Sequence, residues 1–172
     1  TIHGRTKIQG YTPPAYWAPI GEVRRNSDIP VVANGEIWSL DDLKRCQEST
    51  GCMHFMLGRG ALAEPGLVQL CARYLHTPVE RPLFPLRGGS ASHWHELIEL
   101  LVRCSVRMQE SDRRTMSRIK QWLNYAHNKG EVRWFSEVKR ALSSEELLGR
   151  LTDLMHAETA GATKHAAFQL ST

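Results

Sequence analysis

The sequence has 172 residues, of which 41% are hydrophobic, and its formal net charge is +4. This length accommodates one domain or two small ones with a packed core, and the mildly basic charge allows an acidic partner without requiring one. The cysteines form no C-x-x-C pair, which argues against a zinc cage or a dense disulfide framework and favours a cytoplasmic protein; they are Cys46, Cys52, Cys71 and Cys104. No apolar run is long enough to cross a membrane.

The first third of the chain contains two short apolar runs that each end at a glycine. Ile29–Ala33 leads into Asn34-Gly35-Glu36, and Met53–Leu57 leads into Gly58-Arg59-Gly60. A helix-like segment follows each run, so we predict buried strands of a parallel sheet. An earlier strand end, His3-Gly4-Arg5, is rich in hydrogen-bond donors.

These strand ends predict a site for a phosphate-bearing cofactor. Ligands of α/β proteins bind at the carboxyl ends of parallel strands. Glycine lets the backbone approach an anion, the next helix offers free N–H groups, and Arg59 adds positive charge. Taken alone, Gly58-Arg59 is more often a turn with a solvated arginine, and its pairing with Asn34-Gly35-Glu36 favours the cofactor site.

Helical segments alternate with the predicted strands. Tyr16–Arg25 has apolar residues three apart, and a second helix starts at the N-cap Ser39 and ends at Thr50-Gly51. A third is predicted over Leu62–His76, with Pro65 near its start. The order predicts right-handed βαβ units.

After residue 77 the pattern changes from α/β to all-α. We predict an α/β domain over 1–77, a linker over 78–92 that is rich in proline and glycine, a helical domain over 93–156, and a frayed tail over 157–172. The predicted helices of the second domain cover 93–107, 117–127, 134–142 and 144–155.

Three parallel strands cannot close a barrel, and a bare sheet of this size has an open edge. We therefore expect the sheet to continue in sequence outside this chain or to pair with another chain. The first residue is Thr1, and Thr1-Ile2-His3-Gly4 has the pattern of a strand end with nothing before it. These features favour a fragment of a longer protein.

The chain resembles a known enzyme family over roughly residues 1 to 155. The motifs are His3-Gly4-Arg5-Thr6, Ala33-Asn34-Gly35-Glu36-Ile37 and Gly58-Arg59-Gly60-Ala61-Leu62. Together they are similar to the second half of a tRNA-dihydrouridine synthase, and Arg118–Leu123 with Tyr125 is similar to the C subfamily, which acts on position 16 of tRNA. The resemblance implies the C-terminal βα units of an FMN-binding TIM barrel followed by a small helical bundle that binds tRNA. It also implies NADPH as electron donor, and a monomer when the protein is full length.

The same resemblance implies roles for particular residues. The flavin would be held by Asn34, Gly35, Glu36, Gly58 and Arg59, with His3 near the flavin ring, and tRNA would be contacted by Tyr11, Arg118, Lys120, Tyr125, and Lys139 or Arg140. The family's catalytic cysteine lies in the first half of the barrel. None of the cysteines in this chain matches its position, so we expect no catalytic residue here.

Simpler interpretations apply to several of these residues. Basic residues in the helical part can form a solvated face, and Trp122 is expected in the core rather than on RNA. His93 and His95 are two residues apart and diverge on a helix, which argues against a metal site. Two alternative functions remain: a non-catalytic tRNA-binding module, and another FMN barrel oxidoreductase such as a dihydroorotate dehydrogenase relative.

Overall fold

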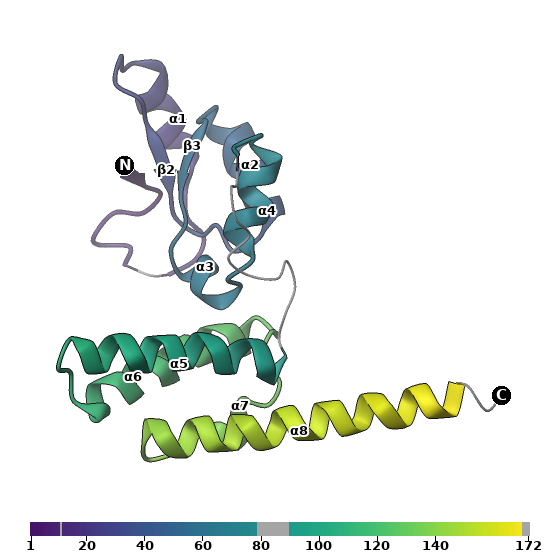
Figure 1. The fold of residues 1–172 in the computed structure, drawn as a ribbon. Helices are drawn as coiled ribbons and strands as arrows, with labels where there is room; N and C mark the ends of the chain where they lie inside the picture. The colour runs from purple at the N-terminus through teal and green to yellow at the C-terminus, as the bar shows by residue number, and fades with distance from the viewer. Residues whose placement is uncertain (11, 79–89, 170–172) are drawn as a thin grey trace. The chain divides into compact units, whose positions relative to one another are not determined.

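The computed structural model describes residues 1–10, 12–78 and 90–169, with side chains described up to residue 160. The chain divides into two compact units, Thr1–Arg87 and Gly88–Thr172. The first is an α/β unit and the second is all-helical (Figure 1). None of the helices in the described residues is long and apolar enough to cross a membrane.

The first unit is built on a parallel sheet in the order β1-β2-β3. Its strands are β1 (Ile2–His3), β2 (Val32–Asn34) and β3 (His54–Met56), and the helices that alternate with them are α1 (Ala18–Arg25), α2 (Leu40–Thr50), α3 (Arg59–Ala63) and α4 (Leu67–Tyr74). Ala33 lies opposite both Ile2 and Phe55. The predicted alternation of parallel strands and helices is confirmed.

Local capping fixes both ends of α2. The Asp42 N–H donates to Ser39 Oγ at 3.1 Å, which satisfies one amide of the first helical turn. Gly51 ends the helix in the left-handed conformation with φ of 66°. The predicted helix bounds are confirmed.

The single helix predicted over Leu62–His76 is wrong, because two helices occupy this region. A break at Glu64–Gly66 separates α3 from α4. Glu64 is extended, with φ of −130° and ψ of 91°, since the ring of Pro65 disfavours a helical conformation for the residue before it.

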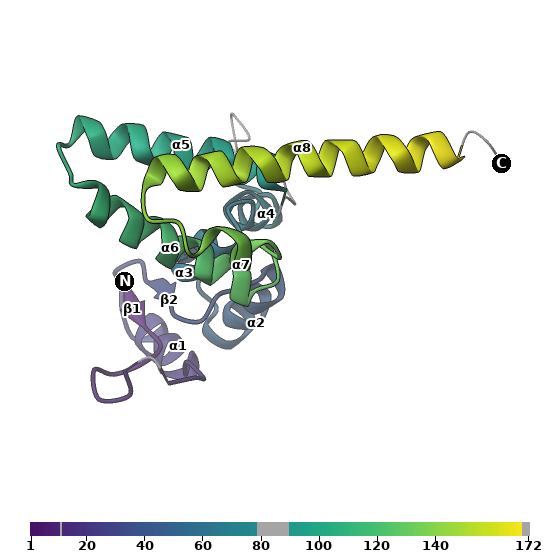
Figure 2. The same ribbon diagram turned by 90° about the horizontal axis from the view of Figure 1, so that it is seen from below.

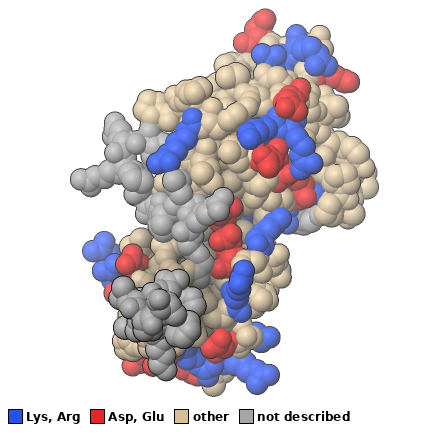
Figure 3. Space-filling model, turned by 90° about the vertical axis from the view of Figure 1, so that its right-hand side faces the viewer, with Lys and Arg blue, Asp and Glu red and all other residues tan. Residues whose placement is uncertain are grey.

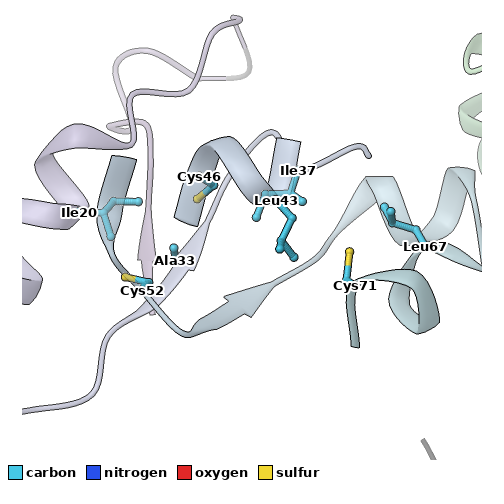
Figure 4. Packing of buried hydrophobic residues seen from close by; sticks show 8 residues of the cluster. All are labelled: Ile20, Ala33, Ile37, Leu43, Cys46, Cys52, Leu67 and Cys71. Carbon is cyan, nitrogen blue, oxygen red and sulfur yellow. The ribbon is translucent and has the colours of Figure 1, made fainter. Parts of the chain in front are cut away.

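The core of the first unit lies on one face of the sheet. Figure 4 shows its buried residues: Ile20, Ala33, Ile37, Leu43, Cys46, Cys52, Leu67 and Cys71. The predicted strand runs are therefore not buried on both faces. Ile29, Met53 and Met56 are 76%, 60% and 53% exposed. His54 is also exposed, because alternate residues of β3 point away from the helices.

The second unit contains α5 (Ala91–Arg107), α6 (Asp112–Asn128), α7 (Phe135–Val138) and α8 (Ser144–Gln169). Helix α5 packs along α8 and also contacts α6. The buried Trp94 ring meets Trp122 edge-to-face, with ring centroids 5.3 Å apart. Trp122 itself is half-buried, so it lies at the edge of the core in which we predicted it.

We predicted that the apolar stripe of α5 consists of Leu97, Leu100, Leu101 and Cys104. Leu97 is buried as predicted, whereas Leu100 and Cys104 are exposed, and the buried face also carries Trp94, Ile98 and Ser105. The contacts of α5 with α8 and α6 select this face, which periodicity alone did not distinguish from its neighbour.

The predicted frayed tail over 157–172 is wrong for most of its length, because α8 continues to Gln169. Its last turns extend beyond the other helices of the unit (Figures 1 and 2). The sequence here is rich in alanine, which has the highest helix propensity. The predicted linker over 78–92 falls largely outside the described residues, and α5 begins at Ala91 near its end.

Candidate cofactor site and nucleic-acid surface

The carboxyl ends of the three strands meet around one small hollow. His3 ends β1, Asn34 ends β2 and is followed by Glu36, and Gly58 and Arg59 come after β3. All of them line this hollow together with Gly35. The strand register places His3 beside Asn34, and Asn34 beside Met56. The structure thus brings together all six residues predicted to bind the flavin, and their binding role stays a prediction.

The turn after β2 is held in an unusual backbone conformation. Gly35 and Glu36 both have positive φ, of 118° and 55°. The Asn34 side-chain amide donates to Met56 O at 2.7 Å, and Trp17 Nε1 donates to Gly35 O at 2.8 Å. These bonds tie the turn to the end of β3 and to the start of α1, so it is a fixed part of the site.

Two arginines converge on one carboxylate oxygen at this edge. Glu36 Oε1 lies 2.8 Å from Arg5 Nη2 and 3.4 Å from Arg59 Nη2. The Arg5 side chain is only 1% exposed, whereas that of Arg59 is 32% exposed and stacks over the Trp38 ring at 5.2 Å. The two guanidinium groups therefore share a single carboxylate oxygen of Glu36.

Arg5 is a site residue that sequence reasoning missed. It was noted only as a donor in the loop after His3, and its partner Glu36 lies in a later βα unit. The sequence feature that could have identified Arg5 was a charged residue two positions beyond a predicted strand end. Its burial, and so its need for a carboxylate, follows from the packing of the loop.

The loops after β2 and β3 touch through a glycine. A Cβ atom at Gly60 would lie 2.3 Å from Ile37 O, so no other residue fits without moving the backbone. At Gly58, by contrast, an added Cβ would meet no atom within 4 Å. The site is thus closed at Gly60 and open at Gly58.

The His3 ring is oriented by a backbone amide. The Arg5 N–H donates to His3 Nδ1 at 3.1 Å. A neutral imidazole that accepts at Nδ1 carries its proton on Nε2. His3 can therefore present an N–H donor to a ligand.

These residues suit an anionic ligand with polar groups. Arg59 and the open backbone at Gly58 can hold a phosphate, while the Glu36 carboxylate can accept a hydrogen bond from a hydroxyl group. Within the described residues, no three His, Cys, Asp or Glu side chains are grouped to hold a metal ion.

The buried cysteines of this unit are inert thiols in the core. Burial raises the pKa of Cys46 to about 12 and that of Cys71 to about 11. Cys52 is buried as well, and Cys104, on α5, is exposed. None of the four lines the hollow at the sheet edge.

The residues predicted to contact tRNA are dispersed in the second unit. Arg118 is paired with Glu110 and also donates to Ser105 Oγ at 2.8 Å. Lys120 is two residues after Arg118 and so points in another direction from α6. The pKa of Glu146 is lowered mainly by the hydrogen bonds that it accepts from the Leu142 N–H and from Arg150, and the charge of Lys120 makes a smaller contribution. Tyr11 lies outside the described residues.

The remaining predicted RNA contacts differ in exposure. Tyr125 is half-buried and its hydroxyl accepts from Gln121 Nε2 at 3.3 Å. Lys139 and Arg140 are exposed after α7. On the face shown in Figure 3, Lys and Arg are interspersed with Asp and Glu rather than gathered into a patch of one sign.

Comparison with known proteins gives consistent matches. A family model described as "Dihydrouridine synthase (Dus)" matches residues 1–159. A tRNA-dihydrouridine(16) synthase of Shewanella oneidensis is 36% identical over 160 residues, which cover 90% of this chain and 46% of the relative. The corresponding protein of Aquipseudomonas alcaligenes is 35% identical, with 85% and 45% covered. That of Escherichia coli O157:H7 is 39% identical, with 72% and 36% covered. The chain spans about half the length of the curated relatives it matches.

Proposed function

The chain belongs to the dihydrouridine synthase family, and from this premise we propose that it forms the FMN-phosphate and tRNA-binding part of a tRNA-dihydrouridine synthase. The proposed reaction is the NADPH-dependent reduction of a tRNA uridine to dihydrouridine. Position 16 is the proposed target, since the relatives described above carry that position in their names. The remainder of the barrel is the proposed partner, because the chain spans less than half of these relatives.

The observation that carries this proposal is the convergence of Asn34, Glu36 and Arg59 at one sheet edge. The donor set fits FMN: Arg59 supplies charge for the phosphate, and a side chain added at Gly58 would occupy the open space beside it. A carboxylate is an unsuitable phosphate ligand, so Glu36 is assigned to a ribityl hydroxyl. When bound, FMN supplies the hydride-transfer chemistry.

The chain's own contribution is binding and orientation. Asn34 and Glu36 hold polar groups of the cofactor at fixed positions, because the turn that carries them is bonded to β3 and α1. His3 would lie beside the ring system, and its hydrogen bond from the Arg5 N–H would leave an N–H donor at Nε2. The target base would have to leave its stack to reach a ring held at this edge.

The tRNA contacts are proposed for the second unit. Lys139 and Arg140 are exposed and available to phosphates. Arg118 would have to exchange Glu110 for a phosphate, so its net contribution is reduced. Tyr125, seven residues after Arg118 on α6, supplies a ring for stacking.

The decisive experiment is a titration of the chain with FMN in which the quenching of flavin fluorescence reports binding. We expect saturable binding that Arg59→Met weakens on the order of tenfold, the usual effect of losing one hydrogen bond to a charged group. Arg73→Met is the matched control, because Arg73 is exposed on α4 away from the hollow. Equal affinities for the Arg59→Met and Arg73→Met variants would contradict the assigned phosphate site.

A non-catalytic tRNA-binding module is the second candidate, favoured by the partial coverage of the relatives. It predicts tRNA binding that is independent of FMN, with no flavin bound at any concentration tested. The other alternative, an unrelated FMN barrel oxidoreductase, does not account for the family match across residues 1–159.

A further inference from the structure

We propose that Arg5 is a positioning residue that fixes Glu36 for the ligand. The inference rests on the proposed function, in which Glu36 contacts the ribityl chain of FMN. Arg5 Nη2 lies 2.8 Å from Glu36 Oε1, and the Arg5 side chain is 1% exposed. A guanidinium with so little exposure has no direct access to a ligand, so any effect on binding passes through Glu36.

Arg5 is itself anchored by its own loop. Its Nε donates to Pro14 O at 3.4 Å, and its backbone N–H donates to His3 Nδ1. Neither Nη atom has a hydrogen-bond partner in the part of the chain that the structure describes, so the contact with Glu36 is a close ion pair rather than an aligned hydrogen bond. This makes the carboxylate the main compensation for a buried positive charge.

The pairing determines which oxygen of Glu36 serves the ligand. Arg5 and Arg59 both approach Oε1, and neither ion pair uses Oε2. Oε2 is thereby available to accept from a hydroxyl group. Without Arg5, the carboxylate would turn toward Arg59, and Oε2 would no longer face the hydroxyl group of the ligand.

The test combines unfolding with the binding of two flavins that differ only in the phosphate. Arg5→Met, Glu36→Gln and the double variant are compared with wild type by urea unfolding, and by titration with FMN and with riboflavin. We expect Arg5→Met to weaken both flavins by the same factor, on the order of tenfold, and the double variant to be no weaker than either single variant. Arg5→Lys should restore most of the affinity because it restores the charge.

Several results would overturn the inference. Loss of FMN affinity alone would show that Arg5 acts on the phosphate, and additive effects would show that it acts independently of Glu36. Unchanged flavin affinity in a destabilised Arg5→Met variant would show a purely structural role. Arg73→Met, on the surface of α4, controls for loss of an arginine.

Failure of the proposed function is distinguishable from failure of this inference. If the wild-type chain binds neither flavin, the flavin assignment fails, and the unfolding cycle alone decides whether Arg5 fixes Glu36. Coupling of more than tenfold between the two substitutions in the unfolding equilibrium constant supports the pair, whereas independent effects overturn it. If Arg5→Met does not fold, Arg5→Gln, which also removes the charge, replaces it in the cycle with Glu36→Gln.

Discussion

Glu36 combines two functions that usually belong to different residues. Its carboxylate compensates the buried Arg5 and also lines the hollow that is assigned to the cofactor. Its backbone adopts a positive φ of 55°, which costs a non-glycine residue about 1 kcal/mol. The ion pair with Arg5 offsets this strain, since a carboxylate elsewhere would leave the guanidinium uncompensated.

Removing the charge of Glu36 is therefore expected to destabilise the first unit. Glu36→Gln should lower the free energy of unfolding by about 3 kcal/mol, the typical effect of leaving one partner of a buried pair alone. Urea unfolding followed by tryptophan fluorescence measures this. Glu48→Gln, at an exposed position of α2, is the control and should change stability by less than about 0.5 kcal/mol.

The buried thiols are expected to resist alkylation. Burial raises the pKa of Cys46 to about 12 and of Cys71 to about 11, so almost no thiolate is present at neutral pH. Iodoacetamide at pH 8 should modify Cys104 quickly in the folded chain, and the others only in urea, as mapped by peptide mass spectrometry. The raised pKa values should also make the free energy of unfolding fall as the pH rises above about 9. In this range the thiols ionise in the unfolded chain but stay protonated in the folded one, which favours the unfolded chain. Rapid labelling of Cys46 without urea would contradict the packing.

Among the elements, α2 shows how capping supports the site. Burial of Asp42 favours its neutral form, but bonds from Arg45, Ser39 and the Trp38 N–H outweigh this and lower its pKa. The Trp38 N–H bond to Asp42 Oδ2 is 3.0 Å long. Since Trp38 also packs against Arg59, the cap of α2 is connected to the side of the hollow that carries Arg59.

The cap is expected to have a pH signature. Asp42→Asn should cost about 1 kcal/mol of stability at pH 7. The difference should shrink as the pH falls below the ordinary value of 3.8, because the lowered pKa of Asp42 contributes stability only above its unfolded value. Urea unfolding at pH 7 and at acidic pH measures this. Asp41→Asn, in the same turn but 84% exposed in its side chain, should show a smaller change.

The elements that the sequence predicted well are those with local signals. Ser39 and Gly51 bound α2 because each acts within its own turn. The break before α4 was missed although Pro65-Gly66 marks it, because a proline near a helix start also suits a first turn. The stripe on α5 was only partly right because the buried face depends on α6 and α8, which no local pattern specifies.

At the scale of the whole molecule, charge distribution limits how tRNA could bind. On the face shown in Figure 3, exposed cations are interspersed with acidic residues, and Arg118 is already paired with Glu110. The grouping of residues at the sheet edge was predictable because parallel strands align their carboxyl ends. The Arg118–Glu110 and Arg5–Glu36 pairs were not, since each depends on tertiary packing.

The salt dependence of tRNA binding is expected to identify the residues that contact phosphates. A Lys139→Gln, Arg140→Gln double variant should weaken binding and reduce the slope of log affinity against log salt by about 1 to 2. Arg118→Ala should reduce the slope less, because it also frees Glu110. Filter binding with unmodified tRNA over a series of KCl concentrations measures both. If affinity did not depend on salt, none of these residues would be contacting phosphate.

The contact between Gly60 and Ile37 O has a kinetic consequence. Because the loops after β2 and β3 already touch at the backbone, they form a single wall that has no room to close further around a ligand. Entry is then through the side that is open at Gly58, with no gating motion beforehand. Stopped-flow mixing with FMN should show one phase whose rate rises linearly with flavin concentration. A rate that saturated would reveal an opening step that this wall does not allow.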